Sequence, residues 1–230
     1  MRSRFAALTA LLLVAVALMA GSAAADDAGG VSPGDPKPGS DAGWVRASAA
    51  GVSMKATVNA LGGGLHTVSG SVARGRRNVV LERELSGTTW KALAYGRSAA
   101  SGSYALSWKV AVYGHIKLRV RATGLTGAPS GTVTAYHRAK ATIFGGPGEY
   151  QDGACGGRIE KGTLGVAHKT LPCGTLVQIS VGNRVMVLPV VDRGPYRAGY
   201  DWDVTFDAAT VLKMDGLATV GYVILGRDGM

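Results

Sequence analysis

The sequence predicts an all-β protein with two folded parts, an N-terminal antiparallel β-sandwich and a small β-barrel that carries one short helix. Three observations predict this. Large apolar residues fall on every second position in segments such as Tyr104–Val110 and His115–Arg121, the period of a half-buried strand. Glycine-rich turn segments, such as 62–64, separate these runs. Charge then divides the chain into a strongly basic part and a nearly neutral part.

The N-terminus has the layout of a secretory signal peptide over residues 1–25. Basic Arg2 and Arg4 precede an apolar run over 5–20, and small residues follow before Asp26. A retained membrane anchor is the alternative, but the run is short for a span and ends in an Ala-x-Ala site. We therefore expect a secreted or cell-wall-associated protein with no transmembrane segment after cleavage.

Residues 26–41 are rich in Gly, Pro, Ser and Asp and have almost nothing to bury, so we interpret them as a flexible linker. The two cysteines, Cys155 and Cys173, would be exported with the rest of the chain. An oxidising compartment favours a disulfide over a zinc site, which two thiols without clustered histidines would serve poorly. This disulfide would close a loop of about 19 residues.

Charge assigns residues 42–140 and 141–230 to separate domains. From residue 42 to 142 there are fourteen Lys and Arg residues against only Glu82 and Glu84, a net charge of +12. From residue 144 to the end there are eight basic and nine acidic residues, a net charge of −1. Such asymmetry indicates two units with separate roles.

The basic part, residues 42–140, reads as short strands separated by turns, and an immunoglobulin-like sandwich is one option. The candidate strands are 54–60, 67–73, 79–85, 90–95, 104–110, 115–121 and 131–137. In the sixth, Lys117, Arg119 and Arg121 would share one outward face.

This cationic face could bind an anionic wall polymer, lipid head groups or acidic polysaccharide, or could simply be a solvated surface. We expect an anionic wall polymer to be the partner of residues 42–140. Sparse interleaved aromatics disfavour nucleic acid.

The second part also reads as strands. Runs 175–180 and 185–191 are joined by the hairpin signal Gly182–Asn183, and 219–225 supplies a closing strand. Residues 206–214 form the predicted short helix, with Thr205 as N-cap.

Three blocks in order carry a resemblance to a known family: GTLGVAHKTLPCGT over 162–175, DRGPY over 192–196 and DWDVT over 201–205. Over about residues 141–225 the chain resembles the RlpA-like double-psi β-barrel family, secreted, actinobacterial-type and expansin-like. The resemblance implies a six-stranded barrel with two interlocking ψ-shaped crossings. It also implies a role on cell-wall polysaccharide, since some members act as lytic transglycosylases and expansins loosen walls without clear hydrolysis.

The candidate catalytic residues are Asp192, as general acid/base, and His168. A lytic transglycosylase needs one well-placed carboxyl, because the 6-hydroxyl of the sugar itself attacks the anomeric carbon. We expect the imidazole and the carboxylate to line one sugar-sized trough. Asp192 could instead be an ionised carboxylate that organises its own turn, and His168 could hold two loops together.

The candidate substrate-binding residues combine acids, a cation and aromatic rings that could cover a sugar face. They are Glu160, Arg193, Tyr196, Tyr200, Trp202 and Asp203. Glu149 is a reserve carboxylate. No metal site or cofactor is expected.

Two functions follow. The first is a module that binds or remodels peptidoglycan glycan, with the cationic domain attached to the wall. The alternative is an active lytic transglycosylase that uses Asp192. Transglycosylase-type members tend to carry an acid about eleven residues before the histidine, where this chain has Gly157, so both functions stay open.

Overall fold

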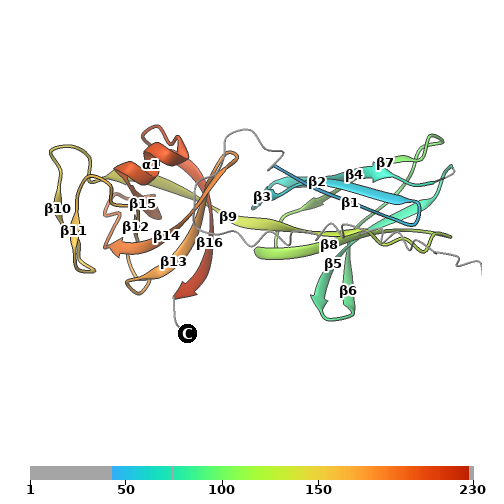
Figure 1. The fold of residues 1–230 in the computed structure, drawn as a ribbon, viewed down its shortest axis with the longest axis horizontal. Coiled ribbons are helices and arrows are strands. Elements are labelled where there is room, and N and C mark those ends of the chain that lie inside the picture. The colour runs from blue at the N-terminus through green and yellow to red at the C-terminus, as the bar shows by residue number, and fades with distance from the viewer. Residues whose placement is uncertain (1–42, 74, 228–230) are drawn as a thin grey trace, which may run out of the picture. The chain divides into compact units, whose positions relative to one another are not determined.

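A computed structural model describes residues 43–73 and 75–227. The predicted signal peptide and linker lie outside these residues. Within the described ranges there is no helix long and apolar enough to cross a membrane. The protein is all-β, as predicted, with a single described helix (Figure 1).

The basic part is a sandwich of two β-sheet layers (Figure 1). One layer has the order β1-β2-β4-β7, and the other contains β6, β5, β8 and β9, with the short β3 beside β9. The strand bounds are β1 Trp44–Ala49, β2 Val52–Thr57, β3 Asn59–Leu61, β4 Leu65–Ser71, β5 Asn78–Ser86, β6 Thr89–Arg97, β7 Ser103–Lys109, β8 Gly114–Ala122 and β9 Ser130–Phe144. The alternation that predicted these strands is visible as burial: β7 reads exposed and buried in strict turn. The immunoglobulin-like label stays a prediction.

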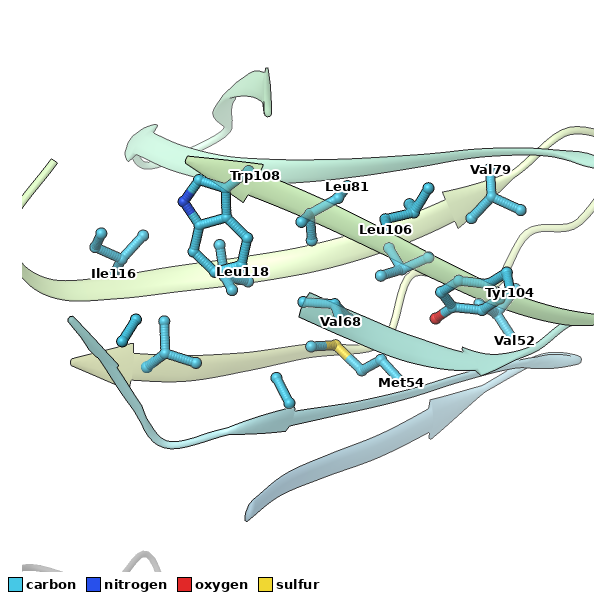
Figure 2. Packing of buried hydrophobic residues seen from close by; sticks show 14 of the residues in the cluster. Val52, Met54, Val68, Val79, Leu81, Tyr104, Leu106, Trp108, Ile116 and Leu118 are labelled. Atoms are coloured by element: carbon cyan, nitrogen blue, oxygen red, sulfur yellow. The ribbon is translucent and has the colours of Figure 1, made fainter. Parts of the chain in front are cut away.

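The sandwich core lies between the two layers, where apolar side chains of both sheets meet (Figure 2). Leu81 and Leu118 from one layer and Val68 from the other have no exposed surface. Burying side chains of this size stabilises the fold by about 1.5–3 kcal/mol each. The period-two pattern in the sequence therefore corresponds to burial in the structure, since one face of each strand supplies the core.

The C-terminal part is a closed barrel of six strands, as the family resemblance implied. Its strands pair in the order β15-β12-β14-β13-β16-β9, and β9 closes the ring by pairing with β15. The bounds are β12 Val166–Ala167, β13 Thr175–Val181, β14 Arg184–Asp192, β15 Trp202–Thr205 and β16 Ala218–Arg227, and a small hairpin outside the ring consists of β10 Gln151–Asp152 and β11 Arg158–Ile159. Two pairings in the ring, β12 with β14 and β9 with β15, are parallel, and the others are antiparallel.

Strand β9 serves both parts. Its first half pairs with β8 of the sandwich, and its second half pairs with β15 and β16 of the barrel. The predicted helix, α1, spans Phe206–Leu212 directly after β15. Thr205 is its N-cap residue as predicted, but the Thr205 hydroxyl makes no cap bond and instead accepts the backbone N–H of Gly165 at 3.1 Å. This bond ties the start of the helix to the segment that leads into β12.

Candidate functional site

Two carboxylates flank one small residue on the barrel wall. In the middle strand β12, Ala167 lies opposite Asp192 of the parallel strand β14 and opposite Asp203 of the antiparallel strand β15. Residues directly opposite each other project from the same face of a sheet, and neighbouring strands lie about 4.8 Å apart. The two aspartate backbones are therefore about 10 Å apart, with Ala167 of β12 between them.

Asp192 is buried, with 7% of its surface exposed, and its carboxylate is held by three donors. One oxygen accepts the backbone N–H groups of Ala154 and Arg193, both at 2.8 Å, and the other accepts the Gln151 side-chain amide at 3.1 Å. Asp192 thus fixes its own turn and the loop that carries Cys155. These three hydrogen bonds give Asp192 an organising role in this part of the barrel.

Asp203 lies in different surroundings. It is half-buried, and one of its oxygens accepts the Thr142 hydroxyl at 2.6 Å. Burial raises the pKa of Asp203 above its ordinary value, and the negative charges of Asp192 and Glu149 raise it further, while the bond from Thr142 opposes them. Asp203 is therefore the carboxyl group of the pair that is better suited to hold a proton.

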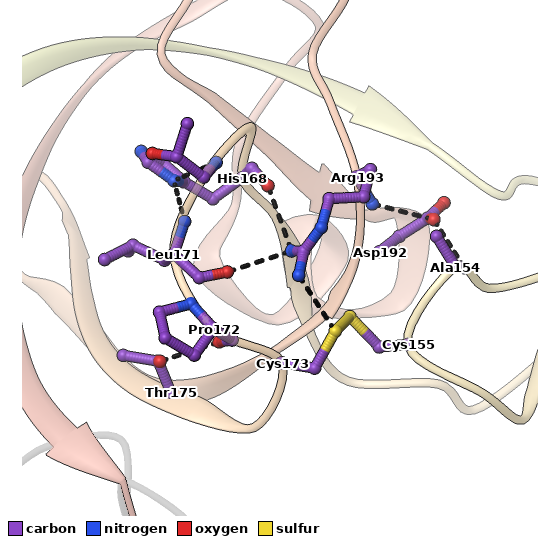
Figure 3. Close-up of a disulfide and its surroundings, with 10 residues drawn as sticks. Ala154, Cys155, His168, Leu171, Pro172, Cys173, Thr175, Asp192 and Arg193 are labelled. Atoms are coloured by element: carbon purple, nitrogen blue, oxygen red, sulfur yellow. Dashed lines mark hydrogen bonds between the residues drawn. A yellow bond between two sulfur atoms is a disulfide. The ribbon is translucent and has the colours of Figure 1, made fainter.

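His168 does not share a trough with Asp192, and this expectation was wrong. The two residues meet only through the backbone, where the His168 N–H donates to the Asp192 carbonyl oxygen at 3.2 Å. Figure 3 shows their side chains on opposite sides of the Arg193 guanidinium. The physical reason is that the two side chains accept hydrogen bonds from different loops, His168 from residues 170–171 and Asp192 mainly from residues 151–154.

The imidazole of His168 instead organises the loop that follows it. Its Nδ1 accepts the backbone N–H groups of Thr170 at 3.3 Å and Leu171 at 3.0 Å, and its ring lies 4.5 Å from that of Trp202. Burial lowers the pKa of His168, and the positive charge of Arg193 lowers it further. A neutral imidazole, accepting at Nδ1, is the form that this loop requires.

Arg193 is committed to the same loop rather than to a ligand. Its guanidinium donates to the carbonyl oxygens of Leu171 at 2.9 Å and His168 at 3.3 Å, and to the sulfur of Cys173 at 3.1 Å (Figure 3). The predicted disulfide between Cys155 and Cys173 is present, with a sequence separation of 18 residues. The expectation that Arg193 binds substrate therefore does not fit the structure, because its donors face carbonyl groups of its own chain.

The remaining predicted residues are scattered. Trp202 is only 1% exposed and packs in the barrel core, so its ring offers no face to a sugar. Tyr196 is the opposite case, with 87% of its surface exposed. Tyr200 is half-buried beneath the guanidinium of Arg197. Glu160 is exposed, and its carboxylate lies 3.7 Å from Arg158.

Sequence reasoning missed two members of the site, Thr142 and Gln151. Both act on a carboxylate through a hydrogen bond, and each lies 41 or more positions before its partner in the chain. Thr142 reaches Asp203 because β9 and β15 pair in parallel, with these two residues in register. Within residues 43–73 and 75–227, no group of three or more His, Cys, Asp or Glu side chains could hold a metal ion.

A closed six-stranded barrel with two parallel pairings, and a wall bearing two aspartates, defines a double-psi β-barrel protein. No family model matches the chain, but curated proteins do. The chain is similar to RlpA proteins, the family that the three sequence blocks predicted.

One relative is an endolytic peptidoglycan transglycosylase RlpA from Rickettsia bellii (strain RML369-C), 36% identical over 104 residues, or 42% of this chain and 46% of that protein. A probable endolytic peptidoglycan transglycosylase RlpA from Aquifex aeolicus (strain VF5) is 36% identical over 81 residues, or 34% of this chain and 36% of that protein. The RlpA of Rickettsia felis (strain ATCC VR-1525 / URRWXCal2) is 33% identical over 116 residues, or 46% of this chain and 51% of that protein. The chain thus spans about half or less of the length of these relatives.

Among solved structures, the chain of a "Biofilm associated protein - BSP domain" aligns over 77% of this chain and 27% of that chain, at 12% identity and a TM-score of 0.26.

Proposed function

We propose that this is an extracytoplasmic cell-envelope protein whose RlpA-like barrel binds and remodels peptidoglycan glycan, and whose cationic sandwich attaches it to the wall. The relatives named as peptidoglycan transglycosylases support the substrate class. The observation that carries the chemistry is the pair of carboxylates on either side of Ala167, one buried and fully hydrogen-bonded, the other half-buried with a raised pKa.

In the proposed reaction Asp203, rather than Asp192, is the proton donor. Cleavage of a glycosidic bond requires a carboxyl group that keeps its proton near neutral pH and releases it to the leaving oxygen. Burial and the charge of Asp192 both act on Asp203 in this direction. Asp192 is then a positioning residue that also supplies the charge that raises the pKa of its neighbour.

The step balances without water or a second reactant. The Asp203 proton moves to the glycosidic oxygen as the bond from that oxygen to the anomeric carbon breaks. The 6-hydroxyl of the same sugar forms a new bond to the anomeric carbon and gives its proton to the Asp203 carboxylate. The products are a shortened strand that ends in a 1,6-anhydro sugar and a released strand, with Asp203 protonated again.

Digestion of purified peptidoglycan by Asp203→Asn tests this proposal. General acid–base catalysis contributes about 10²–10⁴-fold, so the variant should release 1,6-anhydro sugars at least about 100-fold more slowly than the native protein. Asp215→Asn, an exposed carboxylate outside the site, is the matched control and should behave like the native protein. Unchanged release from Asp203→Asn would refute the assignment.

The variant Thr142→Val tests the same assignment through the pH dependence of the reaction rate, which would not shift if Thr142 had a merely structural role. The Thr142 hydroxyl stabilises the charged form of Asp203, so removing this hydroxyl should raise the Asp203 pKa further. The basic limb of the rate–pH profile should therefore move to higher pH. A profile that stays in place would separate Asp203 from the rate-limiting proton transfer.

A non-catalytic glycan-binding module is the second candidate, and the hydrogen bonding of Asp192 favours it, because this family-matched aspartate is engaged by three donors. In that case native protein would sediment with sacculi and release no anhydro sugar, and Asp203→Asn would weaken only the sedimentation.

Attachment through the sandwich is tested by titrating salt during sedimentation with sacculi. Coulombic attraction between exposed charges falls as the Debye length shortens from about 10 Å at 0.1 M salt to about 3 Å at 1 M. We expect retention to fall over this range. Retention that ignores ionic strength would rule out a mainly electrostatic attachment.

A further inference from the structure

The cationic row predicted on β8 is largely neutralised by the protein itself. Arg119 donates to Glu82 at 2.6 Å, and Lys117 lies 3.5 Å from Glu84. Both cations also lie over the ring of Trp90, at 4.1 Å for Arg119 and 5.8 Å for Lys117. Glu82 and Glu84 are the only two acidic residues between positions 42 and 142, and both pair with cations of this row. Arg121 is the third cation of the row.

Two further cations of the same sheet, Arg97 and Arg121, lie at a surface pocket of about 820 Å³ on its outer face. Val80 of β5 lies opposite Tyr95 of β6 and opposite Arg121 of β8. In the adjacent row, Asn78 of β5 lies opposite Arg97 of β6. Because opposed residues project from one face, these five side chains surround the same area, with Val80 as its floor.

The two arginines of this pocket have no partner among the described residues. Arg97 and Arg121 are exposed, and their guanidinium groups make no hydrogen bond or ion pair within residues 43–73 and 75–227. Tyr95 has 79% of its surface exposed, although it lies within strand β6 and pairs with Val80 of β5. By contrast Arg77, at the rim, donates to the carbonyl oxygens of Ala73 and Thr123 and is not available.

We infer that this pocket binds an acidic sugar unit of a polysaccharide, a pyranose ring that carries a carboxylate. The exposed ring of Tyr95 and the apolar floor of Val80 suit the C–H face of a sugar. The two guanidinium groups supply planar, two-pronged donors that match a carboxylate. This inference rests on the proposed attachment role of the sandwich and narrows it to one site and one class of polymer.

Other polyanions fit the pocket less well. Single-stranded nucleic acid is bound by successive aromatic rings, whereas Tyr95 is the only aromatic side chain lining this pocket. A polyol phosphate would satisfy the arginines but has no rigid ring face for Tyr95 and Val80. One aromatic ring, one apolar floor and two guanidinium groups together match a sugar ring that carries a carboxylate better than they match these polyanions.

The test measures binding of the full chain to polygalacturonate at about 0.15 M salt, a condition in which the Debye length is about 8 Å. The neutral comparison polymer is the same polysaccharide with its carboxyl groups methyl-esterified, and the phosphate comparison is poly(glycerol phosphate). We expect the native protein to bind polygalacturonate at least about tenfold more tightly than either comparison polymer, a difference worth about 1.4 kcal/mol.

The variant Arg97→Gln/Arg121→Gln should lose about tenfold or more of this affinity, and Tyr95→Ala should lose about threefold or more. The matched control is Lys91→Gln/Lys109→Gln, which removes the same charge from exposed positions outside the pocket and should stay within about twofold. An equal loss in the control, equal binding of the esterified polymer, or equal binding of poly(glycerol phosphate) would each overturn the inference.

The same variants are then tested for salt-sensitive sedimentation with sacculi. If polygalacturonate binding fails but salt-sensitive sedimentation persists, this inference is wrong while the attachment role stands. If both fail, the attachment role is wrong as well.

Discussion

The sandwich and the barrel bury polar side chains in different ways. The sandwich buries His66 against the ring of Trp108, and the Nε2 atom of His66 has no hydrogen-bond partner among the residues that the structure describes. The barrel buries Asp192, a full charge, and gives it three donors. Buried polar groups cost little only when their hydrogen bonds are made.

The charged groups of the two parts are placed differently as well. The sandwich is held by apolar layers, and its charges lie outside, paired with each other or open to solvent. In the barrel, Arg193, the disulfide and the loops that it joins hold the chain around the carboxylate of Asp192.

The largest expected effect is that of Asp192→Ala on the barrel. It leaves the part-buried backbone N–H groups of Ala154 and Arg193 without their acceptor, at about 1–3 kcal/mol each, so we expect a loss of about 3 kcal/mol in the free energy of unfolding. Amide hydrogen exchange should accelerate in barrel peptides and change little in sandwich peptides. Asp215→Ala, at an exposed position, is the control. Equal acceleration of amide exchange in the barrel and the sandwich would show that Asp192 does not stabilise the barrel specifically.

Removal of the disulfide should come close behind. Cys155→Ser/Cys173→Ser opens a loop with a sequence separation of 18 residues, and the chain-entropy relation assigns about 3 kcal/mol to a loop of this size. Adding a reducing agent to the native protein should reproduce the loss measured for the double variant by urea unfolding. If reduction lowered the stability of the sandwich instead, the bridge would not be acting on the barrel.

A smaller effect should appear in the sandwich as pH falls. Burial lowers the pKa of His66 in the folded state. The stability that neutral His66 contributes is therefore complete above the unfolded-chain value of about 6.5 and is lost as pH falls toward the lower folded-state pKa. Urea unfolding at a series of pH values should show this loss, and His66→Phe should flatten it. His115→Phe, at an exposed position, should leave it in place.

The smallest expected effect on stability is that of Tyr196→Ala. With 87% of its surface exposed, this ring contributes little to folding, and surface substitutions usually stay within about 0.5 kcal/mol. Sedimentation with sacculi should reveal any role in glycan binding, because the thermal transition should not move. A clear drop in the transition temperature would place Tyr196 among the structural residues of the barrel.

Local patterns predicted the elements well because alternation is a local property. Residues 115–121 alternate in sequence, and the burial of β8 follows that alternation. The site was harder to predict, because its geometry depends on which distant strands become neighbours. Ala167 decides which side chains share a face, yet nothing near it in sequence indicates that β14 and β15 flank β12, or that the register shifts between Val166 and Ala167.

Residue types alone misassigned Trp202 and Arg193 for the same reason. Both are typical ligand-binding residues, but their partners in the structure are the barrel core and the carbonyl groups of a neighbouring loop. The pairing of Arg119 with Glu82 was closer to being predictable, since Glu82 and Glu84 are the only acids in a strongly basic segment and alternate along one strand.

The strand β9 has a consequence for anyone who wishes to dissect the molecule. Dividing the chain between residues 140 and 141 would cut a strand that belongs to the barrel as well as to the sandwich, because His137 and Ala139 of β9 pair with β16. A fragment meant to isolate the barrel should therefore begin upstream of Ser130, and it would carry an orphaned edge where β8 had been. Removing either the sandwich or the barrel leaves an unpaired strand edge, which promotes self-association of the fragment.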